Sequence, residues 1–367
     1  MKFSVARGEL VDALSAVSRG LSSRSTLPIL SGILFSAEES GAVTLQATDL
    51  EVSVKNALEA NVSESGQSVL PGRLVADIVR ALPEAAVEIQ LTSDAARIEC
   101  GTSSFSVRTL PAEDFPRFPE VEGDKSVVLD TKTFTSAVTH VSKAVSRDET
   151  RPILTGVLVC VEGPSLRMVA TDSYRLAVKE IVLSENAGAE ANVVIPGKAL
   201  DEVARLASGV ETITFSVSDS QIVFEVGRTV FVTRRIDGTF PNYKQLIPQE
   251  TETKVAVSRE EMLQAVRRVS LLAQHNSPLR ISIQASEQTM TLSATTQDVG
   301  DASEALMVKA EGTDVEIAFN HAFLADGLAA AEGEDVALEM VSPLKPGVLR
   351  ATQDEGFLYL LMPVRLG

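Results

Sequence analysis

The chain has 367 residues, which is too long for one ordinary core, and its composition, 44% hydrophobic and 23% charged, is that of a folded globular protein. Its net charge of −17 argues against a nucleic-acid binder of the usual basic kind, although positive charge is concentrated in the middle third. A membrane span needs ~18 continuous apolar residues and a signal peptide needs an apolar segment near the N-terminus; neither is present, so we expect a cytoplasmic protein.

The first predicted element is an amphipathic helix close to the N-terminus. Its apolar residues are spaced i, i+3, i+4 and i+7, which places them in one stripe along the helix. The same stripe returns at the start of the middle third and again at the start of the last third. The three stripes are Leu10, Ala13, Leu14 and Val17; Phe134, Ala137, Val138 and Val141; and Met262, Ala265, Val266 and Val269.

The segments that follow this helix are also repeated, in the same order and at nearly constant spacing. They comprise a Pro-Ile-Leu run, a run that contains Ala-Thr-Asp, and a second helix that Pro-Gly begins. A repeat of this length indicates architecture, because a catalytic motif is normally written once. The matching segments are 27–35 and 151–159, 43–52 and 166–178, and 68–82 and 193–207, with fainter third copies at 277–285, 292–299 and 317–331.

The remaining segments of each copy predict short strands. Runs such as 86–110 are rich in Val, Ile, Thr and Phe and are broken by turn residues, as antiparallel hairpins require. Each third is therefore predicted to be an α+β domain, with two helices packed on an antiparallel sheet. Polar linkers separate the thirds, and we expect the three domains to span 1–120, 126–247 and 251–367.

Residues that could support catalysis or metal binding are sparse. His140, His275 and His321 lie far apart with no ligand-like spacing, and Cys100 and Cys160 each lie in an apolar, strand-like run. The chain has no phosphate-binding glycine loop and no nucleophile elbow. We therefore expect no enzyme activity, no metal and no cofactor.

The repeated Thr-Asp pairs are candidates for paired catalytic carboxylates. They occur as Thr48-Asp49 and Thr171-Asp172, at equivalent places of two copies. A residue that is duplicated in this way favours a structural task, here an Asp side chain that hydrogen-bonds a turn between strands. In the third copy the carboxylate shifts to Asp298. A turn can accommodate such a shift, whereas a catalytic pair within one mechanism could not.

Basic residues recur at matching positions of the predicted helices. For any one of them a solvated helix face is the simpler interpretation, but the recurrence favours a shared basic surface. Arg73 matches Lys198 and Arg80 matches Arg205; Arg24 follows the first helix, and Lys143, Arg147 and Arg151 follow its counterpart.

Several motifs, taken together and in order, resemble the bacterial β sliding clamps, the processivity subunits of replicative DNA polymerases. The resemblance covers the whole chain and implies a head-to-tail homodimer, in which six similar domains form a ring around duplex DNA. Such a ring tethers the polymerase and has no catalytic activity of its own. The motifs are MKF at the start, R-x-TLPIL at 24–30, YRLAV at 174–178, DGTFPNY at 237–243 and MPVRL at 362–366.

The resemblance also implies where DNA passes. Arg24 and Lys198 match DNA-contacting positions of the family, and we add Arg73, Arg147 and Arg151 from their location in the repeat. Because a closed ring holds DNA by enclosure, few and weak phosphate contacts suffice, and the acidic net charge becomes compatible with a DNA partner.

A peptide-binding pocket between the second and third domains is implied as well. In the family it takes short hydrophobic motifs from the polymerase, the clamp loader, other polymerases, mismatch-repair proteins and ligase. The matching residues here are Leu154, Thr171, Tyr174, Arg175, Leu176, Pro241, Leu246, Met362, Pro363, Val364 and Arg365.

The expected dimer contact joins the first and third domains of two chains. Phe105 and Val107, on a predicted edge strand, would meet Leu271 and Leu272, which follow the opening helix of the third domain. Two other classes of function stay open: an enzyme with a site at a domain junction, and a scaffold that binds peptides but no nucleic acid.

Overall fold

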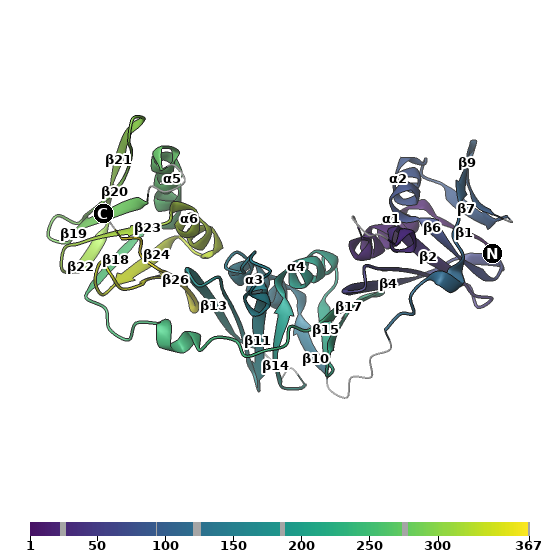
Figure 1. The fold of residues 1–367 in the computed structure, drawn as a ribbon, viewed down its shortest axis with the longest axis horizontal. Coiled ribbons are helices and arrows are strands. Elements are labelled where there is room, and N and C mark those ends of the chain that lie inside the picture. Colours follow the sequence, from purple (N-terminus) through teal and green to yellow (C-terminus); the bar gives the residue numbers. More distant parts are fainter. Residues whose placement is uncertain (23–26, 93, 120–125, 184–187, 274–277, 366–367) are drawn as a thin grey trace. The chain divides into compact units, whose positions relative to one another are not determined.

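The computed structural model describes residues 1–22, 27–92, 94–119, 126–183, 188–273 and 278–365. Packing divides the chain into two compact units, which we call unit 1 (Met1–Phe134 with Lys198–Arg235) and unit 2 (Thr135–Gly197 with Ile236–Gly367). Each unit combines one outer third of the chain with part of the middle third. Figure 1 shows the elements of both units.

Unit 1 contains a five-stranded antiparallel sheet in the order β5-β1-β7-β8-β9. Within the described ranges strand β9 pairs with β8 alone, so one of its sides is an open edge. The bounds are β1 (Lys2–Ala6), β5 (Asn61–Glu64), β7 (Ala86–Leu91), β8 (Ala95–Cys100) and β9 (Ser103–Arg108).

A second sheet of unit 1 joins the first third of the chain to the middle third. Its eight strands follow the order β10-β15-β16-β17-β4-β3-β2-β6, and β17 pairs with β4 so that Thr233 lies opposite Val52. The bounds are β2 (Gly32–Ala37), β3 (Ala42–Thr48), β4 (Val52–Glu59), β6 (Gly66–Pro71), β10 (Ser126–Asp130), β15 (Thr212–Val217), β16 (Gln221–Val226) and β17 (Thr229–Arg234).

In unit 2 a sheet likewise joins strands from the middle third of the chain to strands from the last third. Its nine-stranded sheet has the order β14-β11-β12-β13-β26-β25-β24-β18-β22, and β13 pairs with β26 so that Arg175 lies opposite Leu361. The bounds are β11 (Gly156–Glu162), β12 (Ser165–Thr171), β13 (Arg175–Val182), β14 (Ala191–Pro196), β18 (Thr253–Ser258), β22 (Lys309–Gly312), β24 (Asp335–Met340), β25 (Gly347–Ala351) and β26 (Asp354–Leu361).

A four-stranded sheet completes unit 2, in the order β21-β20-β19-β23. Strand β21 is an end strand of this sheet and, among the described residues, it pairs with β20 alone. The bounds are β19 (Leu279–Gln284), β20 (Thr289–Thr296), β21 (Gly300–Met307) and β23 (Val315–Phe319).

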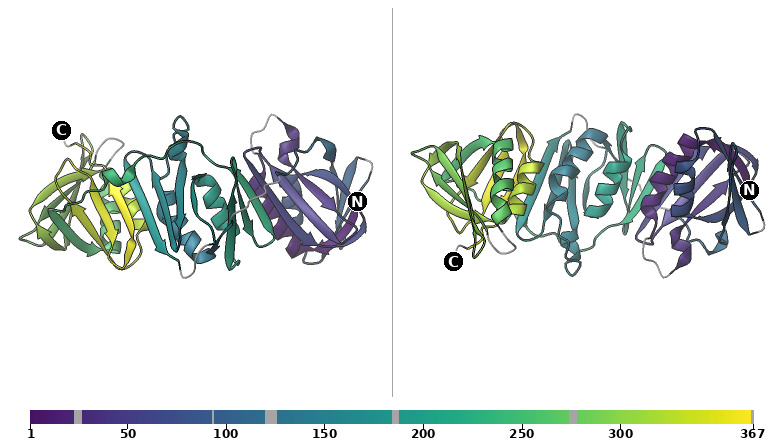
Figure 2. Two further views of the ribbon diagram at one scale, coloured as in Figure 1. Left: turned by 90° about the horizontal axis from the view of Figure 1, so that it is seen from below. Right: turned by 90° about the horizontal axis from the view of Figure 1, so that it is seen from above.

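Six α-helices are found in the described part of the chain, and all three predicted apolar stripes are buried. Helices α1 and α2 pack against each other in unit 1, as α5 and α6 do in unit 2 (Figure 2). None of the six is long and apolar enough to cross a membrane. The bounds are α1 (Arg7–Val17), α2 (Gly72–Ala81), α3 (Thr131–Ser142), α4 (Gly197–Leu206), α5 (Arg259–Val269) and α6 (His321–Ala330).

The two Thr-Asp pairs form turns, as predicted. Asp49 Oδ1 accepts hydrogen bonds from the backbone N–H groups of Glu51 and Val52, at 3.0 and 2.7 Å. Asp172 Oδ1 does the same for Tyr174 and Arg175 at 2.9 and 3.0 Å. Both turns also place one residue in the left-handed region, with φ of 78° at Leu50 and 80° at Ser173. The pairs therefore have a structural task in strand-to-strand connections.

Candidate functional site

Most of the residues predicted to form a peptide surface come together in unit 2, where β13 and β26 run side by side. Met362, just after β26, donates its backbone N–H to the carbonyl of Tyr174 at 2.9 Å, and Val364 donates to Ala318 at 2.8 Å. Pro241 and Leu246 belong to the 3-10 helix η5 (Tyr243–Leu246) and the residues just before it. The residues Met362 to Val364 are thus held between the start of β13 and the strand that contains Ala318.

A buried apolar cluster lies beneath this surface. It contains Leu176, Tyr243 and Leu360 together with Val169, Val178, Val348 and Leu358, and Phe240 and Ile247 pack against it. Leu176 itself is 1% exposed, and Leu154 and Thr171 are also buried. These three residues can shape the floor of a binding surface, but a ligand cannot cover them extensively in this conformation.

Among the exposed members of the set, Arg365 is charged and the others are apolar or aromatic. Tyr174 is 62% exposed, Leu246 46%, Met362 39% and Val364 38%. Pro363 and Arg365 lie between and beyond the last two, in the non-regular chain end. Exposed apolar side chains that gather over a rigid cluster are typical of a protein-interaction site.

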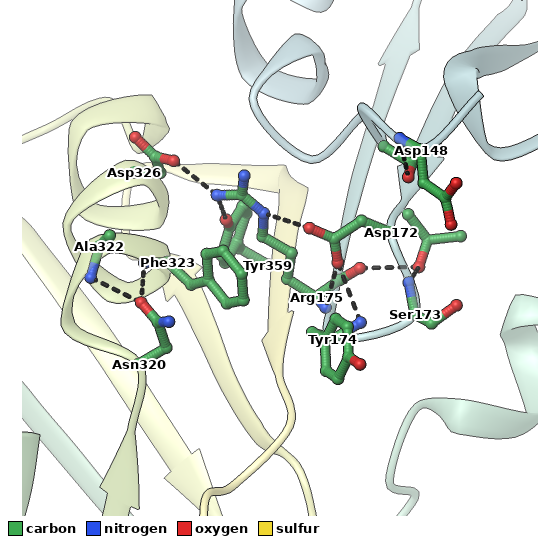
Figure 3. Close-up of polar contacts among 12 residues, drawn as sticks. Asp148, Asp172, Ser173, Tyr174, Arg175, Asn320, Ala322, Phe323, Asp326 and Tyr359 are labelled. Carbon is green, nitrogen blue, oxygen red and sulfur yellow. Dashed lines mark hydrogen bonds and ion pairs between the residues drawn. The ribbon is translucent and has the colours of Figure 1, made fainter. Parts of the chain in front are cut away.

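Arg175 lies at the centre of an ion-pair network within unit 2 (Figure 3). Its Nε donates to Asp172 at 3.0 Å, and its Nη1 donates to Asp326 of α6 at 2.5 Å and to the Tyr359 hydroxyl at 3.1 Å. The guanidinium carbon also lies 4.3 Å from the ring centroid of Phe323, which stacks on Tyr174. The guanidinium is therefore occupied by its own chain and positions the neighbouring aromatic residues.

The charge of Arg175 is maintained by these partners. Burial by itself would lower the pKa of Arg175, but Tyr359, Asp326 and Asp172 outweigh it and raise that pKa above its usual value. For the Tyr359 phenol burial acts in the opposite direction and raises the pKa, so this hydroxyl stays protonated. Sequence reasoning missed Asp326, Tyr359 and Phe323, since no local pattern connects them to Arg175.

The predicted DNA-binding residues lie on or next to helices, in both units. Arg73 on α2, Lys198 on α4 and Arg147 after α3 are exposed, and no ion pair or hydrogen bond of their side chains is seen within the described ranges. Arg151 instead donates to Asp148 at 2.9 Å and to Ser173 at 3.0 Å. Arg24 lies outside the described residues.

The predicted dimer residues lie on or next to two of the end strands of the sheets, β9 and β21. Phe105 and Val107 are on β9, with Phe105 40% exposed and Val107 buried. Leu271 and Leu272 belong to the 3-10 helix η6 (Ser270–Leu272), which packs against β20 and β21. Leu271 is 81% exposed. An open edge next to an exposed leucine is a surface that another chain can cover.

A metal centre has no support among the placed residues, where no group of three His, Cys, Asp or Glu side chains lies in a suitable arrangement. The cysteine thiols are free, and burial raises the pKa of Cys160.

Comparison with known proteins gives matches along the full chain. Residues 1–119, 128–242 and 244–365 match the models of the N-terminal, central and C-terminal domains of the DNA polymerase III beta subunit. The beta sliding clamp of Streptomyces coelicolor is 36% identical, with 100% of both chains covered. The crystal structure of the DNA polymerase sliding clamp from Bacillus subtilis is 30% identical and covers 100% of both chains with a TM-score of 0.95. A Pseudomonas aeruginosa sliding clamp bound to griselimycin is 27% identical, with full coverage of both chains and a TM-score of 0.94.

Proposed function

The chain belongs to the DNA polymerase III beta subunit family, and we propose that two copies of it close into a ring that encircles duplex DNA. The chain consists of three clamp domains, for which we propose the bounds 1–120, 126–247 and 251–367. The ring would tether the replicative polymerase to its template and have no catalytic activity of its own. Its place of action would be the cytoplasm.

The observation that carries this proposal is the full-length similarity to solved sliding clamps, with a TM-score of 0.95. Two features of the chain support a closed assembly. The sheets continue across the repeat boundaries at β17–β4 and β13–β26, and the end strands that carry or adjoin the proposed dimer residues, β9 and β21, each have one side without a partner strand among the described residues. Pairing of unlike edges between two chains gives a head-to-tail contact, which closes into a ring when the rotation allows it.

The decisive experiment separates enclosure from ordinary affinity. The protein is assembled on a nicked circular plasmid with a clamp loader and then passed through a gel-filtration column. We expect the protein to stay with circular DNA at moderate salt and to leave within minutes after a restriction enzyme linearises the plasmid. Equal retention on circular and linear DNA, or no retention on either, would favour a scaffold that does not enclose DNA.

Contacts with DNA are proposed to be few, weak and independent of sequence. Arg24, Arg73, Lys198, Arg147 and Arg151 are the proposed contacts. Arg73, Lys198 and Arg147 suit this role because they are exposed and have no side-chain partner within the described ranges, whereas Arg151 would have to exchange its pair with Asp148 for a phosphate. Each lost phosphate contact should reduce the slope of log affinity against log salt by about one unit.

Lys198→Ala should therefore flatten the salt dependence of binding to a short duplex by about one unit while hardly changing the unfolding midpoint. The reason is that Lys198 is exposed and has no partner to lose among the placed residues. Fluorescence anisotropy at several salt concentrations measures the slope. Arg280→Ala is the matched control, because Arg280 is an exposed arginine on β19 that already pairs with Glu316 at 3.1 Å. A slope that changes equally in both variants would argue against a specific contact at Lys198.

The apolar surface of unit 2 is proposed to bind short hydrophobic peptide motifs of the polymerase, the clamp loader, other polymerases, mismatch-repair proteins and ligase. A Pseudomonas aeruginosa relative has been solved bound to griselimycin. In this chain Tyr174, Leu246 and Met362 are exposed above a buried apolar cluster, and they offer a hydrophobic peptide motif an apolar surface. A flexible methionine suits partners of different shape.

Met362→Ala should weaken binding of such a peptide by about 1–2 kcal/mol, roughly ten-fold, because the side chain would be covered on binding. Fluorescence polarisation with a labelled polymerase-tail peptide measures the affinity. The fold should be unaffected, since Met362 is 39% exposed and lies beyond β26. Val182→Ala is the control, as this exposed valine lies at the other end of β13 from Arg175. Unchanged affinity in the Met362 variant would place the peptide elsewhere.

A further inference from the structure

Unit 1 contains a cavity of about 700 Å³ between the end of α1 and α4. Val52, Ala199 and Phe231 form its apolar side. The polar side carries the cations Arg19, Lys198 and Arg205, the carboxylates Asp49, Asp201 and Glu202, and the hydroxyls of Ser15 and Ser18. The volume lies within the range of about 300–1,000 Å³ that small-ligand sites occupy. The cavity is distinct from the peptide surface, whose residues all belong to unit 2.

The same place in the next copy of the repeat is filled by side chains. The strand pairings match Val52 of β4 with Arg175 of β13, since Val52 lies opposite Thr233 and Arg175 lies opposite Leu361. Ala199 and Phe323 are likewise the third residues of α4 and α6. In unit 2 the guanidinium of Arg175 packs on the ring of Phe323. Unit 1 has a valine and an alanine there, so the space of a guanidinium and an aromatic ring is left empty.

The polar groups around the cavity leave donors unsatisfied. Glu202 accepts from both Arg19 and Arg205, and Asp49 Oδ1 already accepts two backbone N–H groups. In contrast, the ammonium of Lys198 has no partner within the described ranges, and Arg19 Nε is buried without an acceptor. A small turn of the Arg19 guanidinium toward an acceptor in the cavity would satisfy a donor whose burial alone is costly.

We propose that this cavity binds an apolar carboxylate, the chemistry of a peptide that ends in an aromatic or large aliphatic residue. The side chain would occupy the space next to Val52 and Ala199 that Phe323 fills in the other copy. The carboxylate would accept hydrogen bonds from Lys198 and Arg19. A DNA phosphate would also suit Lys198 but would leave the apolar side of the cavity uncovered, so an apolar carboxylate fits better. The inference does not depend on ring formation.

The test uses the full chain and N-acetyl-L-phenylalanine as the probe, with binding followed by saturation-transfer NMR. N-acetyl-L-phenylalaninamide, which lacks the carboxylate, and N-acetylglycine, which lacks the ring, are the matched probes. Both should bind at least roughly ten-fold more weakly than the carboxylate with the ring. Equal binding of the amide, or no binding of the probe at low-millimolar concentration, would overturn the proposal.

Two variants tie binding to the cavity. Ala199→Phe fills it from α4 and Val52→Arg fills it from β4, in each case with the residue that the other copy carries, and each should abolish probe binding. Ala199→Ser keeps the space and should bind the probe within roughly two-fold of the unaltered chain. Unfolding midpoints in urea confirm that each variant is folded. If the probe still binds to both filling variants, the cavity is not its site. The proposal would also be contradicted if the filling variants weaken binding of a short DNA duplex and leave binding of the probe unchanged.

Discussion

Replacing Arg175 with methionine should lower the free energy of unfolding of unit 2 by about 3 kcal/mol, because it removes the cation of a largely buried ion-pair network. The Arg175 side chain is 10% exposed and bridges Asp172 to Asp326, while Asp172 is 13% exposed. Methionine keeps most of the apolar contact with Phe323 but leaves the carboxylates without their cation. Urea unfolding followed by circular dichroism measures the change.

The control for this variant is Arg280→Ala. Its pair with Glu316 is about half exposed on both sides, so the loss should be no more than about 1 kcal/mol. The double variant Arg175→Met with Asp326→Asn should recover part of the loss, because it removes one of the carboxylates that the first change leaves unpaired. Equal free energies of unfolding for the Arg175 and Arg280 variants would show that the buried network stabilises the fold no more than an exposed ion pair does.

Leu271→Asp should convert the proposed dimer into single chains, with a dissociation constant raised at least about 100-fold. Leu271 is 81% exposed in the isolated chain, so an aspartate there stays solvated in the monomer but must lose water at an interface with a second chain. Sedimentation velocity over a range of protein concentrations measures the association.

The matched control for assembly is Val182→Asp, since Val182 is equally exposed at 80% and lies at the end of β13 in the same unit. That variant should assemble as the unaltered chain does. A Leu271 variant that still assembles at low concentration would place the contact between chains away from η6. Unfolding midpoints that match that of the unaltered chain would exclude misfolding as the cause of dissociation.

Features with a local cause could be predicted from the sequence. The three apolar stripes are buried because their i, i+3, i+4, i+7 spacing places them on one helix face whatever the helix packs against. The Thr-Asp turns form because the Asp side chain bonds backbone groups two and three residues later. The three-domain organisation followed from the order of these local signals along the chain.

Features that depend on distant partners could not be predicted in the same way. Arg175 was recognised only through a family motif, and its partners Asp326 and Tyr359 lie 151 and 184 residues away in sequence. The exposure of the pocket residues was equally hidden, since Leu176 and Met362 are both apolar but 1% and 39% exposed. Neither composition nor periodicity distinguishes a residue buried beneath the binding surface, such as Leu176, from one exposed on it, such as Met362.

The sequence by itself determined that one α+β module is written three times and where its helices and turns lie, because periodicity and turn chemistry act within a few residues. Only the tertiary structure decided that β17 joins β4 and β13 joins β26, so that the sheets continue across the repeat boundaries. It also decided that equivalent positions differ, with Arg175 filling a space that Val52 leaves open. The physical reason is that strand pairing and cavity volume depend on which distant side chains meet, and the repeat fixes the positions of the backbone but not the sizes of those side chains.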